Sequence, residues 1–240
     1  MKTVIGLTGL GLVVASLAAC GAIREAHMAV PSGVASSTER LELKGMGGWH
    51  KGRFQLAGSE GRFTRSAEKA DFFDSLWVKR RGGGTFSLSG PEVEGELSGS
   101  CRYSEDEVNI GPFSARPKRL SYRCDFSHDG RPIDARLILE ENDDSLGSAF
   151  MKEERDGALY FEGQRIGLRS IHKIEESRIS LATPIGYMFD LRGRDIGGVD
   201  LNGSDHTLFV PRDRELRQAV LAASVALSVF WDPADTDPDR

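Results

Sequence analysis

The sequence predicts a mainly β fold, an antiparallel barrel or sandwich of glycine-turned hairpins around a buried hydrophobic C-terminal helix. Two observations predict it. Residues 41–210 read as short alternating segments with turns about every eight to twelve residues, the spacing of antiparallel sandwiches and barrels. Residues 219–231, AVLAASVALSVFW, are apolar apart from two serines. Together they indicate a single β-rich domain over residues 41–231.

The chain begins with a secretion signal over residues 1–19. Lys2 supplies a positive charge, an uncharged apolar segment follows, and small residues precede Cys20. The apolar part is shorter than the roughly 20 residues that a membrane span needs. Its end, LAAC, resembles the lipobox of bacterial lipoproteins. The resemblance implies cleavage before Cys20, diacylglycerol on its thiol and a fatty acid such as palmitate on its amino group; an ordinary signal with an incidental cysteine is the alternative.

Lipidation of Cys20 would hold the protein on a membrane through its N-terminus. The residue after the cysteine is Gly21 rather than the aspartate that commonly retains lipoproteins at the inner membrane. The resemblance therefore implies the outer membrane of a Gram-negative bacterium, facing the periplasm. Residues 20–40 are small, polar and without pattern, so we expect a flexible tether there.

Three segments share a hairpin pattern: an aromatic residue, Gly-x-x-Ile, then glycine or aspartate. They are FSHDGRPID (126–134), YFEGQRIG (160–167) and FDLRGRDIG (189–197). Glycine suits the positive φ of tight hairpin turns, so each is expected to be a β-hairpin. Before the C-terminus, only residues 66–76 suggest a helix, a short one begun by a serine cap.

Two cysteines remain once Cys20 is lipidated. Cys101 and Cys124 both lie in strand-like segments, and an even count in an oxidising compartment predicts a disulfide between them.

The apolar C-terminal segment is predicted to be a helix over residues 212–231, followed by an acidic tail over 232–240. Pro211, Asp213 and Glu215 suit its first turn. Apolar residues cover every face, so the helix belongs inside a protein or a membrane. Its short length favours the protein core, where serine hydroxyls can bond to carbonyls one turn back. Membrane or partner contact is the alternative.

Hairpins at 160–167 and 189–197 followed by an apolar helix resemble the tubby C-terminal-like superfamily, which includes LURP-one proteins and phospholipid scramblases. In that family an antiparallel barrel of about twelve strands wraps a hydrophobic helix near the C-terminus. The resemblance covers residues 120–231 and implies the same architecture here. It also implies a phospholipid headgroup as a ligand class.

The sequence predicts no catalytic centre, metal site or cofactor. None of the five histidines lies in a zinc or hydrolase motif, and a Ser–His–Asp set assembled by the fold stays open. The whole chain carries a net charge of −5, which is unfavourable for nucleic-acid binding. One basic cluster, Lys79, Arg80 and Arg81, is a candidate anion contact.

Three functions follow as hypotheses. The first is a non-catalytic envelope lipoprotein that binds a partner protein or serves structurally. The second is a lipid or anionic-headgroup binding protein. The third is a hydrolase whose catalytic residues are scattered along the chain.

Overall fold

The protein is a closed antiparallel barrel of twelve strands, here seen in a computed structural model that describes residues 26–72, 76–110, 113–142 and 153–233. The strands are β1 (Thr38–Lys44), β2 (Lys51–Leu56), β3 (Ser59–Phe72), β4 (Trp77–Ser89), β5 (Glu96–Ile110), β6 (Phe113–His128), β7 (Arg131–Glu141), β8 (Arg155–Phe161), β9 (Gln164–Ile171), β10 (Gly186–Leu191), β11 (Arg194–Asp200) and β12 (His206–Pro211). Each pairs with the next, and β1 pairs with β12 to close the ring. The predicted fold class is confirmed as a barrel.

The three repeated hairpins are confirmed. In each turn a non-glycine residue and the following glycine both have positive φ, at Asp129–Gly130, Glu162–Gly163 and Arg192–Gly193. Two successive left-handed residues are what type I′ turns require, and their twist matches that of the strands they join. The turns therefore set the register of β6–β7, β8–β9 and β10–β11.

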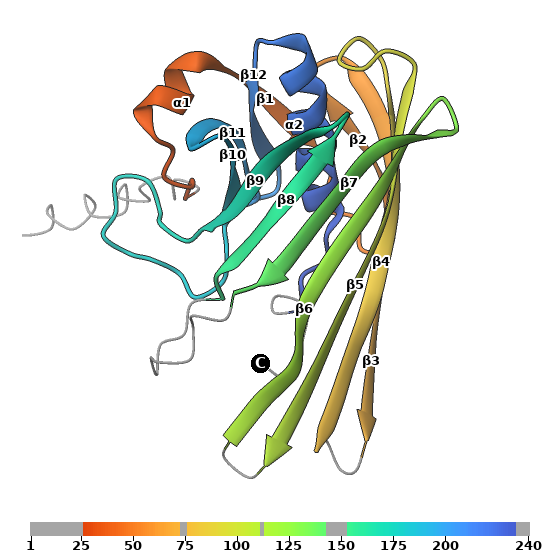
Figure 1. Cartoon of the computed structure of the whole chain (residues 1–240), viewed down its shortest axis with the longest axis vertical. Helices are drawn as coiled ribbons and strands as arrows, with labels where there is room; N and C mark the ends of the chain where they lie inside the picture. Colours follow the sequence, from red (N-terminus) through yellow and green to blue (C-terminus); the bar gives the residue numbers. More distant parts are fainter. Residues whose placement is uncertain (1–25, 73–75, 111–112, 143–152, 234–240) are drawn as a thin grey trace, which may run out of the picture.

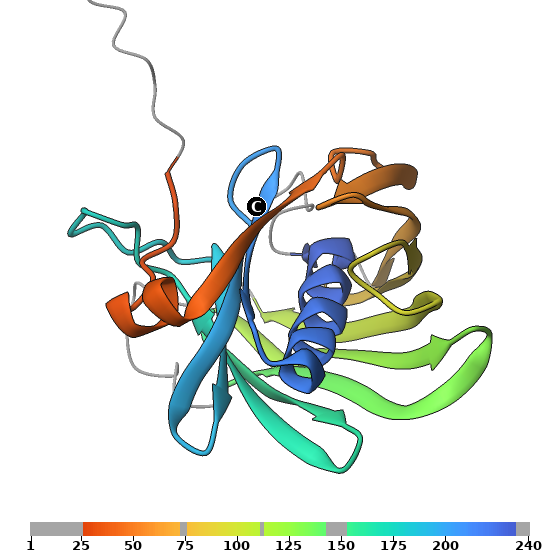
Figure 2. The same ribbon diagram turned by 90° about the horizontal axis from the view of Figure 1, so that it is seen from above.

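Helix α2 (Arg214–Val229) runs through the barrel, as Figure 2 shows. Every residue from 219 to 229 is buried, so the predicted core position is confirmed. The helix is shorter than predicted: Asp213 is its N-cap, and its carboxylate accepts from the N–H of Leu216 at 3.0 Å. Pro211 ends β12 instead of starting the helix.

The C-terminal end of α2 is held by two side chains from the barrel wall. Tyr122 on β6 donates its hydroxyl to the carbonyl of Ala226 at 2.6 Å, and Arg65 on β3 donates to that of Ser228 at 2.8 Å. A cation at this end also complements the negative pole of the helix dipole. Burial raises the pKa of Tyr122 and lowers that of Arg65.

Two further sequence expectations were wrong. Residues 66–72 belong to the strand β3 and not to a helix. From residue 26 onward the predicted tether is ordered, since Met28 and Val34 are buried against β10 and the short helix α1 (Ser32–Ser37) leads into β1. Glycine at 186 and 198 makes this possible, because a Cβ there would lie 2.5 and 3.1 Å from the Met28 side chain. Residues 20–25 of that tether and the tail after 233 lie outside the described residues.

Strands β3 to β6 extend past one end of the barrel (Figure 1). We call this extension the projecting sheet; it comprises residues 67–72, 77–82, 103–110 and 113–122, which begin at the paired row Ala67–Gly82–Tyr103–Tyr122. The glycine run after the basic cluster lies inside β4 and not in a hairpin turn. A Cβ at Gly82 would lie 2.5 Å from the Tyr103 ring, and one at Gly84 would lie 2.6 Å from Val229 of α2. Glycine here lets the wall approach the helix.

Candidate functional site

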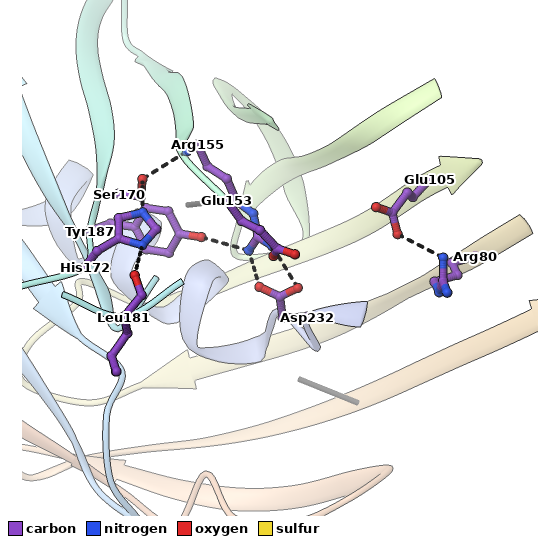
Figure 3. A network of polar contacts seen from close by, with 9 residues as sticks. All are labelled: Arg80, Glu105, Glu153, Arg155, Ser170, His172, Leu181, Tyr187 and Asp232. Atoms are coloured by element: carbon purple, nitrogen blue, oxygen red, sulfur yellow. Dashed lines mark hydrogen bonds and ion pairs between the residues drawn. The ribbon is translucent and has the colours of Figure 1, made fainter. Parts of the chain in front are cut away.

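A buried ion-pair cluster lies below the C-terminal end of α2 (Figure 3). Arg155 on β8 is 3 % exposed and forms a two-pronged ion pair with Asp232, which follows the helix. Glu153 accepts from the same guanidinium at 3.0 Å, and Tyr187 lies 3.4 Å from it. Burial, the largest single influence, would lower the pKa of Arg155, but Asp232, Tyr187 and Glu153 together outweigh burial and raise this pKa. The cluster fixes the chain after α2 to the barrel wall.

A serine and a histidine meet beside this cluster. Nε2 of His172 lies 3.0 Å from Oγ of Ser170, and Nδ1 of His172 lies 3.1 Å from the carbonyl of Leu181 (Figure 3). Because a carbonyl only accepts, Nδ1 carries a proton, and in the neutral imidazole Nε2 then accepts from the serine hydroxyl. This is the nucleophile–base contact of hydrolases, with a carbonyl in the position of the usual carboxylate. Ser170 Oγ also accepts from the backbone N–H of Arg155 at 2.9 Å.

Side chains alternate between the two faces of β4, so the three residues of the predicted anion contact do not point the same way. Arg80 points inward, is buried and contacts Glu107 at 2.7 Å and Glu105 at 3.6 Å. Arg81 points outward and contacts Asp106 at 2.6 Å. The neighbouring strand β5 carries acids where β4 carries bases, so the two arginines are already neutralised within the sheet. Lys79 instead lies over two aromatic rings, described below.

A second basic region, unrecognised in the sequence, lies on the outer wall of the barrel. A groove of about 530 Å³ crosses β2 to β5, and cations on β2 and β3 line one side of it: Lys51, Arg53 and Arg62. This size falls in the range of roughly 300–1,000 Å³ typical of ligand sites. We call it the outer groove.

The outer groove holds a pair of like charges. Arg53 and Arg62 are direct partners across β2 and β3, a placement that normally costs stability. Arg102 and Arg123 are a second such pair on β5 and β6, but Arg102 lies 3.9 Å from Asp125, and Arg123 lies 3.6 Å from Glu140. Within the described part of the chain, neither arginine of the groove has a carboxylate within ion-pair distance.

Hydroxyl groups continue the same rows across the sheet. Arg62 is paired with Ser87, and Ser87 with Ser98. One step along, Lys51 is paired with Thr64, and Thr64 with Thr85, whose hydroxyls lie 2.8 Å apart. The groove therefore presents cations on one side and hydroxyls on the other, and one carboxylate, that of Glu96 on β5, also belongs to its lining. Three cations against one carboxylate suit a ligand with an anionic group and several hydrogen-bonding groups.

Cys101 and Cys124 are paired across β5 and β6 with an S–S distance of 2.06 Å, as predicted. Cys20 lies outside the described residues. Among those that are described, no three His, Cys, Asp or Glu side chains gather as a metal ion would require, and no helix is both long and apolar enough to span a membrane.

Comparison with known proteins finds no match. No protein family, curated protein or solved structure matches the chain.

Proposed function

We propose that the chain is a lipid-anchored envelope protein whose barrel binds an anionic ligand in the outer groove. The observation that carries the proposal is the uncompensated pair Arg53–Arg62, because the protein neutralises its other cross-strand arginine pair and leaves this one facing a groove. Helix α2 fills the interior of the barrel, so we infer that a ligand binds on the outer surface.

The chemistry of the groove favours a phosphate ester with a polyol carrier. Two guanidinium groups match the oxygens of a phosphate, and Lys51 adds a third cation. The serine and threonine hydroxyls on β4 and β5 suit the hydroxyls of a glycerol-type carrier. A phospholipid headgroup and a soluble glycerol phosphate share this chemistry.

Isothermal titration calorimetry of the full chain with glycerol 3-phosphate and with short-chain phosphatidylglycerol separates these two sources. Hydrogen bonds to charged groups contribute about 1.5–3 kcal/mol each in buried sites, and less in an open groove. We therefore expect Arg53→Gln with Arg62→Gln to weaken binding at least tenfold, roughly 1.4 kcal/mol. The matched control, Arg102→Gln with Arg123→Gln, should leave binding unchanged. Equal loss in both double variants, or no binding of either ligand, would refute the proposal.

The membrane anchor is a separate part of the proposal, supported by the signal and by the LAAC sequence that ends at Cys20. Metabolic labelling with a palmitate analogue tests it. The mature chain should carry the label, and Cys20→Ser should abolish it.

The Ser170–His172 hydrogen bond supports a second candidate, an esterase-type hydrolase with Ser170 as nucleophile and His172 as base. A fluorophosphonate probe should then label the wild-type chain and not Ser170→Ala. An unlabelled wild-type chain removes this candidate.

A further inference from the structure

The end of the β3–β4 hairpin carries exposed apolar side chains on the projecting sheet. The described residues include six large hydrophobic side chains that are exposed, and half of them lie at this end: Phe72, Leu76 and Trp77, between 40 and 45 % exposed. Figure 1 places this end at the far tip of the longest strands, away from the closed barrel.

Phe72 and Trp77 belong to one row of side chains that crosses the sheet. Phe72 and Trp77 are direct partners across β3 and β4, and Trp77 is paired on its other side with Val108 of β5. Direct partners lie on one face of a sheet, so all three face the outer side. The next hairpin, β5–β6, ends beside them at the backbone pair Ile110–Phe113.

Lys79 lies two residues behind this row on the same face. Its ammonium is 5.3 Å from the centre of the Phe72 ring and 5.2 Å from that of Trp77. Lys79 is the one cation of the predicted basic cluster that has no carboxylate partner among the described residues. Tryptophan with a neighbouring lysine is the pairing that proteins use at the membrane–water interface, where the ring enters the acyl boundary and the ammonium stays with the headgroups.

We propose that this tip, Phe72, Leu76 and Trp77 with Lys79 behind them, enters the interfacial layer of a phospholipid bilayer. The size of the patch favours a bilayer over a protein partner. Phe72, Leu76 and Trp77 are each nearly half exposed, so together they present on the order of 300 Å² of apolar surface to solvent. A specific protein interface buries about 1,200–2,000 Å². An exposed row at the end of a sheet also fits a fluid bilayer without needing a complementary pocket.

The depth of Trp77 in a membrane tests the proposal. The full-length mature chain is reconstituted in vesicles of phosphatidylethanolamine and phosphatidylglycerol that contain a phospholipid brominated on its acyl chain. Bromine quenches tryptophan within contact range, so wild-type emission should fall, and Trp77→Phe should lose most of that quenching. The other tryptophans, Trp49 and Trp231, then report only the remainder.

Exposed-residue variants separate insertion from folding. Phe72→Ser with Leu76→Ser should reduce the quenching of Trp77 at least twofold. Tyr160→Ser, which removes an equally exposed aromatic side chain elsewhere, should leave it unchanged. A chain that floats with the vesicles but whose Trp77 emission is not quenched by bromine overturns the proposal. The test is independent of the outer groove, since Arg53→Gln with Arg62→Gln should not alter Trp77 quenching.

Discussion

Replacing Ser224 by alanine should stabilise the protein. Ser224 lies in the middle of α2 with 0 % exposure, and its hydroxyl has no hydrogen-bond partner within the described residues. The sequence had predicted a bond to the carbonyl one turn back, so this position differs from expectation. A buried hydroxyl without a partner costs about 1–3 kcal/mol.

The size of the gain follows from three contributions. Removing the hydroxyl recovers its desolvation cost, and alanine gains up to about 0.7 kcal/mol in helix propensity. The lost contacts of one oxygen and the small void that it leaves oppose both. We expect a net gain of about 1–2 kcal/mol, seen in urea unfolding followed by circular dichroism, with a rise of roughly 2–8 °C in Tm.

The reciprocal variant is the control. Ala223 is equally buried on the same helix, so Ala223→Ser introduces one more buried hydroxyl and should destabilise the protein by about 1–3 kcal/mol. The reasoning would be refuted if Ser224→Ala lost 1 kcal/mol or more, because the hydroxyl would then have a partner that stabilises it.

Two further predictions concern charge. Burial, aided by the nearby cation of Arg65, lowers the pKa of His206 to about 4. The unfolded chain therefore takes up a proton first, and stability should fall by up to about 3 kcal/mol as pH drops from about 6.5 to 4. His206→Gln should flatten this part of the pH–stability curve, and an unchanged slope would contradict the assignment. Asp232→Asn leaves the buried Arg155 short of a counter-charge and should cost about 3 kcal/mol in chemical unfolding, whereas Asp125→Asn in an exposed pair should cost less than about 1. Equal costs would show that burial of the Asp232 pair does not matter.

Local patterns were enough to predict the elements with strong periodicity. The type I′ turns at Gly130, Gly163 and Gly193 are encoded in a few adjacent residues, and the burial of α2 follows from its apolar faces. The helix predicted at residues 66–72 was wrong because a serine followed by a glutamate is also compatible with a strand when a neighbouring strand, here β4, supplies a partner for every residue. Tertiary pairing here outweighed a weak helix signal.

The candidate sites depend on register, which one sequence does not reveal. Lys79–Arg81 looked like a free basic cluster because its neutralising acids on β5 are more than twenty residues away in the chain. Conversely, Lys51, Arg53 and Arg62 are scattered among glycine and phenylalanine, and only the pairing of β2 with β3 brings them together. Alternation with the inward-facing Phe54 and Phe63 could have shown that they point outward.

The order of synthesis has a consequence for how this barrel forms. Its first strand, β1, can pair with β12 only after the ten strands between them have been synthesised, and the helix that fills the interior follows β12 in the chain. Until α2 arrives, the apolar inner faces of twelve strands have nothing to pack against. Closure of the barrel must therefore wait for the synthesis of α2, and such non-local closure is slow. A chain that lacks α2 would leave the apolar inner faces of the strands exposed, so we expect it to aggregate.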